Sequence, residues 1–98
     1  MSAESISSQH IEKETIPELK FPKEEVLSDP AAREERRKKL EQCMLLGNNS
    51  KVKVKIYFED NTGLKEVETT VWTVSEEYIS LKQNVMIPIK RIHAVNIL

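Results

Sequence analysis

The sequence has few glycines, cysteines and aromatic residues, and each shortage excludes a class of protein. Among its 98 residues are 2 glycines, 1 cysteine and 1 tryptophan, and aromatic residues make up 5%. A single cysteine cannot form a disulfide within the chain, which argues against a small disulfide-stabilised secreted domain. The sequence also contains no Gly-rich phosphate loop, no nucleophile motif and no His or Cys cluster with the spacing of metal ligands. We therefore expect no enzymatic activity, no cofactor and no metal site.

An excess of charge of one sign and long apolar runs are also missing. The 15 basic and 16 acidic residues leave a net charge of -1, so bulk positive charge cannot drive nucleic-acid binding. No run of about 20 apolar residues could span a membrane, and the first residues do not resemble a signal peptide. These absences predict a cytoplasmic protein in a reducing environment. A chain of this length has room for one domain, since domains typically hold about 100 to 150 residues.

Residues 1–28 follow neither a helical nor a strand period. Their apolar residues are widely spaced, and Pro17 and Pro22 each remove a backbone donor. We predict a flexible N-terminal tail that contains one candidate docking segment, residues 16–22. Such a segment would place apolar side chains in a groove of a partner or of its own domain, and an unengaged linker is the alternative. The candidate docking side chains are Ile16, Leu19 and Phe21.

A helix is predicted to start at the Asp-Pro pair of residues 29–30 and to stop at Gly47. Aspartate accepts hydrogen bonds from free amide groups at a helix start, proline is tolerated at the first helical position, and glycine commonly follows a helix end. Apolar residues gather only in the last two turns, where we expect Cys43 to be buried. The basic residues of the helix form either a salt-bridged solvent face or a partner surface. Those assigned to a partner surface are Arg33, Arg36 and Arg37.

The period changes to two from Lys51 onward, which predicts short strands with tight connections. A hairpin turn is expected at residues 60–63 and a shorter one at 83–84. Five short antiparallel strands leave exposed edges in an open sheet, and closure into a small barrel removes those edges. The sequence therefore predicts a mainly β domain over residues 29–98, with one N-terminal helix and a five-stranded antiparallel barrel. The expected strands cover residues 51–58, 67–74, 78–82, 85–90 and 94–98.

Four short motifs occur in a suggestive order along this domain. They are Leu-Ser-Asp-Pro at 27–30, Val-Lys-Ile-Tyr at 54–57, Gly-Leu-Lys at 63–65 and Ile-Lys-Arg at 89–91. They are similar to the helix start, the first strand, the first turn and the Lys-His segment of the bacterial Sm-like family known as Hfq. The resemblance covers about residues 27 to 98 and implies an Sm-like barrel that assembles into a homo-oligomeric ring and binds RNA. Other small barrels, such as the Rho-inhibiting protein Rof, share the strand order and bind proteins.

The candidate nucleic-acid residues come from one strand face and from this resemblance. Alternation places Lys51, Lys53, Lys55 and Tyr57 on one side of the first strand, where they could follow a phosphate backbone and stack a base. A solvated strand face is the alternative reading. The resemblance adds Lys65, Tyr78, Lys90 and Arg91, with Tyr78 in the place of a base-binding aromatic or of a core residue. We expect Trp72 in the core or in a subunit interface, with base stacking as the alternative.

Two functions from different classes follow from these features. The leading hypothesis is a non-enzymatic, Sm-like protein that binds single-stranded RNA, or a ribonucleoprotein, through its basic strand face. The second hypothesis is an adaptor or regulator that docks on a larger protein complex through the N-terminal tail and the basic helix. Neither hypothesis requires a membrane.

Overall fold

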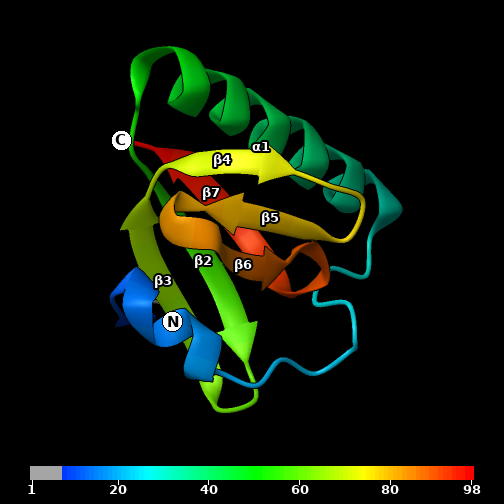
Figure 1. Ribbon diagram of the computed structural model, residues 1–98. Coiled ribbons are helices and arrows are strands. Elements are labelled where there is room, and N and C mark those ends of the chain that lie inside the picture. Colours follow the sequence, from blue (N-terminus) through cyan, green and yellow to red (C-terminus); the bar gives the residue numbers. More distant parts are fainter. Residues whose placement is uncertain (1–7) are drawn as a thin grey trace.

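The protein has a mainly β fold with one main helix, and the computed structural model describes residues 8–98 (Figure 1). The strands are β1 (Gln9–His10), β2 (Val54–Asp60), β3 (Gly63–Thr69), β4 (Val71–Val74), β5 (Tyr78–Leu81), β6 (Val85–Pro88) and β7 (Ile92–Ile97). The helices are α1 (Pro30–Ser50) and three 3₁₀ turns, η2 (Lys13–Glu18), η3 (Lys82–Asn84) and η4 (Ile89–Arg91).

Within residues 8–98, seven strands form two open sheets, whereas the sequence predicts five strands in one closed barrel. A four-stranded sheet has the order β1-β3-β2-β7, and a three-stranded sheet has the order β4-β5-β6. No ladder joins the two sheets within residues 8–98. Figure 1 shows the three-stranded sheet in front of the four-stranded one, with α1 running beside β4. The buried core draws on both sheets, on α1 and on the N-terminal segment.

Helix α1 starts where the sequence predicts and ends later. The Asp29 Oδ1 atom accepts a hydrogen bond of 3.1 Å from the amide of Ala31, which caps the first turn. The predicted stop at Gly47 is wrong, because the helix continues to Ser50 and Lys51 takes the left-handed capping conformation with φ 53°. Gly47 has a packing role instead: a Cβ there would lie 2.5 Å from the carbonyl oxygen of Val71. The glycine therefore allows α1 to approach the start of β4.

The hairpin of β2 and β3 follows from alternation and from one aspartate. Val54, Ile56 and Phe58 are fully buried, whereas the residues between them are partly exposed. Strand β2 begins at Val54 rather than at the predicted Lys51, because Lys51 closes the helix. The expected turn is confirmed, since Asp60 Oδ1 accepts hydrogen bonds from the amides of Thr62, at 2.9 Å, and of Gly63, at 3.1 Å.

The chain passes from one sheet to the other at Thr70 without a glycine. This single residue separates β3 from β4, and the pairing of β4 with β5 shifts register between Val71 and Thr73. The break lies directly after Thr69, the last residue of β3. The sequence predicts one strand over residues 67–74, and the break at Thr70 divides this β-branched stretch between the two sheets.

The last three strands are joined by two tight 3₁₀ turns. The predicted short turn between β5 and β6 is present, and both of its central residues have positive φ, with Gln83 at 69° and Asn84 at 61°. Strand β6 stops at Pro88 and η4 begins at Ile89, after which β7 starts at Ile92 instead of the expected residue 94. Strand β7 pairs with β2 and so returns the chain to the four-stranded sheet.

Residues 8–28, called the strap here, lie against the domain, although the sequence places them in a flexible tail. Strand β1 pairs in parallel with β3. Ile16 is 1% exposed, and the ring of Phe21 lies with its centroid 6.0 Å from that of Phe58. The candidate docking segment thus packs on its own domain, which was one of its two predicted destinations. Residues 1–7 of the predicted tail lie outside the described residues.

Candidate functional site

The predicted basic face of β2 is not continuous. Lys51 caps the helix and Lys53 precedes the strand, so only Lys55 and Tyr57 lie on β2 itself. The ammonium of Lys55 lies 3.4 Å from a carboxylate oxygen of Glu66 and 3.7 Å from one of Glu68, both on the neighbouring β3. The charge of Glu66 raises the pKa of Lys55. The neighbouring acids thus neutralise the middle of the predicted face.

Two of the residues expected to contact RNA are buried in the fold. Lys65 is 6% exposed, and its ammonium lies 2.9 Å from Asp60 Oδ1 and 2.6 Å from the Thr62 hydroxyl. Arg91 is also 6% exposed, and its guanidinium donates to the carbonyl oxygens of Glu59, at 3.0 Å, and Glu24, at 2.7 Å. Their charges stabilise the β2–β3 turn and the strap, which corrects the expectation that they face a ligand.

The arginines of the helix also hold parts of the fold together. Arg36 is 8% exposed and is hydrogen-bonded to the strap. The Arg33 Nε donates to the carbonyl oxygen of Leu27 at 2.8 Å. Arg37 donates to the carbonyl oxygens of Ser75, at 3.1 Å, and Glu76, at 2.7 Å. The predicted partner surface on the helix is therefore largely occupied by contacts within the chain.

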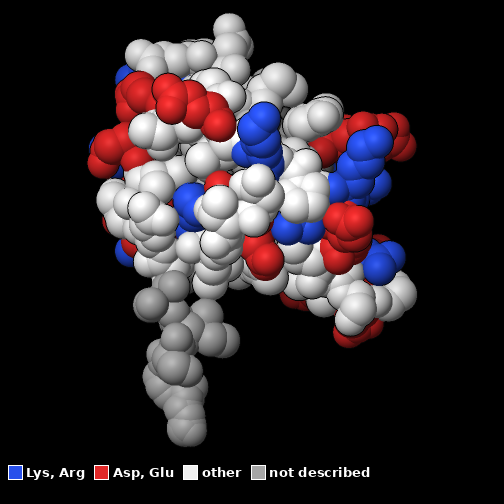
Figure 2. All heavy atoms as spheres, turned by 90° about the horizontal axis from the view of Figure 1, so that it is seen from below, with Lys and Arg blue, Asp and Glu red and all other residues white. Residues whose placement is uncertain are grey.

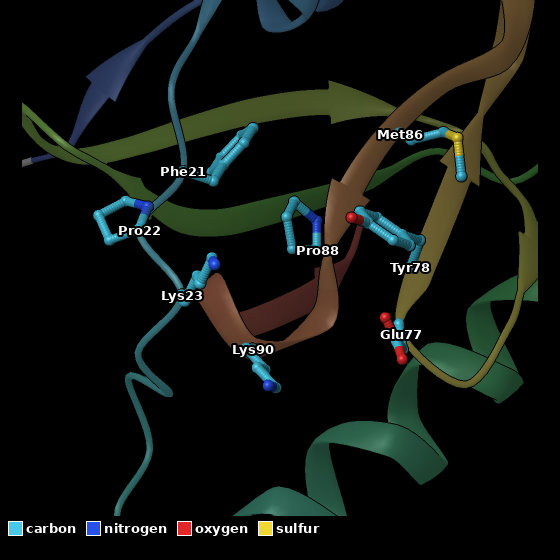
Figure 3. Close-up of a pocket in the computed structure, with 8 residues that line it drawn as sticks. All are labelled: Phe21, Pro22, Lys23, Glu77, Tyr78, Met86, Pro88 and Lys90. Carbon is cyan, nitrogen blue, oxygen red and sulfur yellow. The ribbon is translucent and has the colours of Figure 1, made fainter.

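Tyr78 and Lys90 come together in a groove of about 520 Å³ between the strap and the β5–β6 hairpin (Figure 3). We call this the strap groove. Tyr78 is 40% exposed, so its alternative placement in the core is wrong. An acid, Glu77, also faces this groove. The complete lining consists of Phe21, Pro22, Lys23, Glu77, Tyr78, Met86, Pro88 and Lys90.

A second hollow, of about 350 Å³, gathers lysines without acids. It lies where the end of α1, the start of β4 and η3 meet, and we call it the lysine hollow. Its charged residues are Lys51, Lys53 and Lys82, and none of these forms an ion pair with another residue of the described chain. The remaining lining residues are Gly47, Asn48, Thr70 and Trp72.

Trp72 is 43% exposed beside these lysines, so its expected placement in the core is wrong, whereas a subunit interface and base stacking stay predictions. The alternation of residues along this stretch of the sequence indicates that the Trp72 side chain is exposed. Val67, Thr69 and Val71 share one parity and are all buried, so the next residue points to the opposite face. The sequence does not predict Lys82 as a member of this site. It lies in the turn after β5, and no local sequence pattern connects that turn to the end of the helix.

The face seen in Figure 2 carries charges of both signs, and the described residues offer no metal site. On the face seen in Figure 2, acidic and basic side chains are interspersed, in keeping with the net charge of -1. No group of three or more His, Cys, Asp or Glu side chains within residues 8–98 could hold a metal ion. The helices in this range are too short or too polar to cross a bilayer.

Comparison of the chain with protein-family models, with curated proteins and with solved structures found no match. The geometry of the strap groove and of the lysine hollow is therefore the feature that bears on function.

Proposed function

We propose that the chain is a non-enzymatic Sm-like small-barrel protein that binds single-stranded RNA through the lysine hollow. The path of the chain supports the barrel. A helix is followed by strands paired in the orders β3-β2-β7 and β4-β5-β6, and one residue separates β3 from β4. If β3 and β4 are taken as one bent strand, five antiparallel strands remain after the strap is set aside, which is the Sm-like arrangement that the sequence motifs resemble.

The observation that carries the RNA proposal is the grouping of Lys51, Lys53 and Lys82 around the exposed face of Trp72. Phosphates are bound by ammonium groups, and single-stranded bases stack on aromatic rings. Stacking of this kind contributes about 1–3 kcal/mol per base and tolerates any base. The hollow therefore contains the two components that recognition of a single strand requires.

One effect opposes anion binding at this place. The hollow lies at the C-terminal end of α1, where the helix dipole amounts to about half a negative charge. That partial charge acts mainly within the last turn, whereas three lysines bring three full positive charges. The attraction of the three lysines for phosphate therefore exceeds the repulsion from the helix end. The strap groove lacks this advantage, because Glu77 lines it together with two lysines and would repel phosphate.

The experiment is a titration of the full chain with short A-rich and U-rich single-stranded RNAs at low and moderate salt. We expect binding that weakens with salt. A plot of the logarithm of the binding constant against the logarithm of the salt concentration should have a slope of about -0.7 for each phosphate contact. The double variant Lys53→Glu with Lys82→Glu should lose binding at least tenfold, and Trp72→Ala should lose about fivefold or more, as stacking energies indicate.

The matched control is Lys38→Glu with Lys39→Glu, which makes the same charge change at two exposed positions of α1 away from the hollow. It should leave the affinity unchanged after correction for net charge. Absence of binding at tens of micromolar RNA, or an equal loss in the control and in the double variant, would contradict the proposal.

Assembly into a homo-oligomer belongs to the same proposal. Strands β1 and β7 are the two edge strands of the four-stranded sheet within the described residues, so each has an edge available to another copy. Measurement of the solution mass by light scattering tests this. A ring mass is expected, and a monomer over a wide range of concentration would refute the ring while leaving RNA binding at the hollow to be judged by the titration.

A further inference from the structure

The strap groove differs in chemistry from the lysine hollow and shares no residue with it. Most of its lining is apolar, from Phe21 and Pro22 on the strap and from Tyr78, Met86 and Pro88 on the hairpin. Met86 is 50% exposed and Tyr78 40% exposed, so both large side chains present free surface. Such a mixture of aromatic, proline and methionine side chains is typical of grooves that accept apolar side chains of a partner.

The edge of β6 that borders this groove has unused backbone hydrogen-bonding groups. The amide of Ile89 donates to the carbonyl oxygen of Glu77 at 2.9 Å, which makes this residue pair a hydrogen-bonded one. Hydrogen-bonded and non-bonded pairs alternate along an antiparallel ladder, so Met86, opposite Ser80, belongs to a non-bonded pair. Its N–H and C=O therefore point away from β5. Figure 3 shows β6 between β5 and the strap, which places this outer edge on the groove.

The charges around the groove are arranged by sign. Lys23 and Lys90 lie on the strap side, whereas Glu77 lies on the β5 side beside Tyr78 (Figure 3). None of these three side chains forms an ion pair with another residue in the range 8–98. A ligand that carries negative charge beside the two lysines would complement them.

We propose that the strap groove binds an extended acidic and apolar peptide segment of a partner protein. The segment adds to the outer edge of β6 by hydrogen bonds with Met86, in the manner of strand addition to a sheet. A bulky apolar side chain of the segment packs between Tyr78 and Met86. An Asp or Glu next to it lies beside Lys23 and Lys90. RNA is disfavoured here, because the groove offers its bases an apolar wall and its phosphates a nearby carboxylate.

The experiment uses a phage-displayed library of random peptides selected on the full chain, followed by synthesis and titration of the enriched peptides. Enriched sequences should place a large apolar residue next to Asp or Glu. The variant Met86→Glu, and separately Lys23→Glu with Lys90→Glu, should reduce the affinity at least tenfold. Trp72→Ala, in the lysine hollow, should leave it unchanged, which separates this proposal from RNA binding.

Two variants at one position test the strand addition. Met86→Ala removes the side chain and keeps the N–H, whereas Met86→Pro removes both and is tolerated by an edge whose N–H faces outward. Met86→Pro should therefore bind at least fivefold more weakly than Met86→Ala, with circular dichroism confirming that both remain folded.

Three outcomes would overturn the proposal. The first is a selection without enrichment, or enriched peptides that lack the acidic and apolar pattern. The second is competition between bound peptide and RNA together with loss of RNA binding in Lys23→Glu with Lys90→Glu, which would make the groove a nucleic-acid site. The third is an oligomer of the wild-type chain that Met86→Glu disrupts, because the edge would then be occupied by a second copy.

Discussion

Arg36 of helix α1 holds Glu25 of the strap through two parallel hydrogen bonds. The Arg36 Nη1 atom lies 2.7 Å from Glu25 Oε2, and Nη2 lies 2.8 Å from Oε1. The same Nη1 donates to the carbonyl oxygen of Ile92 at 3.0 Å, so one side chain joins the helix, the strap and β7. A guanidinium fork suits this task because its geometry matches a carboxylate.

Removal of either partner alone should destabilise the protein. Arg36→Met leaves the Glu25 carboxylate without its main donor, and Glu25→Leu leaves a buried guanidinium charge, so each should cost about 3 kcal/mol of unfolding free energy. The double variant should cost less than the sum of the two, because no unpaired charge remains. Urea denaturation of the four proteins measures this coupling. If the two single losses of unfolding free energy simply add in the double variant, Arg36 and Glu25 do not stabilise each other.

The same pair predicts how stability depends on pH. Hydrogen bonds from Arg36 are the main reason that the pKa of Glu25 is lowered. A carboxyl group with a lowered folded pKa stabilises the protein above its ordinary value of about 4.3 and loses this contribution as the pH falls through the folded pKa. The stability difference between wild type and Glu25→Gln should therefore shrink in acid. Denaturation at a series of pH values checks the sign, and a constant difference would argue against it.

Gly47→Ala should destabilise the protein although alanine is the better helix former. Alanine gains about 1 kcal/mol in helix propensity. Its Cβ would lie 2.5 Å from the Val71 carbonyl oxygen and 2.8 Å from Thr70 Cγ2, so the helix must move away from β4. We expect a net loss of about 1–2 kcal/mol, as for other overpacked sites. Thermal unfolding measures it, with Asn49→Ala at an exposed position of α1 as the control that should stabilise slightly.

The buried Asp60–Lys65 pair should respond unequally to the loss of its two members. Asp60 keeps three donors when Lys65 is replaced, two amides and the Thr62 hydroxyl. Lys65 loses its only ion-pair partner within the described residues when Asp60 is neutralised, and its ammonium charge stays buried. Asp60→Asn should therefore cost about 3–5 kcal/mol, as for a buried unpaired charge, and Lys65→Met clearly less. Equal losses in chemical denaturation would show that the ion pair does not control the turn.

Acid should also weaken this turn. Burial by itself would raise the pKa of Asp60, but hydrogen bonds from Lys65 and Thr62 outweigh it and the pKa is lowered. Its stabilising contribution is thus present at neutral pH and lost as the pH falls through the folded pKa.

Ile16 should stabilise the domain from within the strap. Its side chain is 1% exposed and belongs to the main core. Ile16→Ala should cost about 2–5 kcal/mol, the usual cost of such a deletion in a core, whereas Glu18→Ala, two residues away and exposed, should be nearly neutral. A chain that starts at Ser28 lacks Ile16, Phe21 and Glu25 together and should melt at a much lower temperature. Unchanged melting of that shorter chain would mean that the strap adds nothing to stability.

Local chemistry accounts for the parts of the fold that the sequence predicted. The Asp29 cap, the alternation along β2 and the Asp60 turn each depend on residues within a few positions of one another. Their side chains satisfy or bury neighbouring groups, so a pattern in the sequence is sufficient. The predictions of one helix and of a mainly β domain are confirmed for the same reason.

Contacts between distant residues account for the errors. Gly47 is typical of a helix end, but its role depends on Val71, which lies in another element. Lys65 and Arg91 look like free cations in the sequence, and only the folded chain pairs them with Asp60 and with the carbonyl oxygen of Glu24. Of the eight predicted nucleic-acid residues, Lys51 and Lys53 lie in the lysine hollow, because their place after the helix end is set locally.

The position of Trp72 decides what the natural fluorescence of this protein reports. It is the single tryptophan of the chain, it lies 43% exposed on β4, and it lines the lysine hollow rather than the core. Its emission in the folded protein is therefore expected near that of a hydrated indole, with a small change on denaturation. A ligand that stacks on the ring would quench the signal strongly. Intrinsic fluorescence is thus an occupancy probe for the hollow, and folding is better followed by circular dichroism.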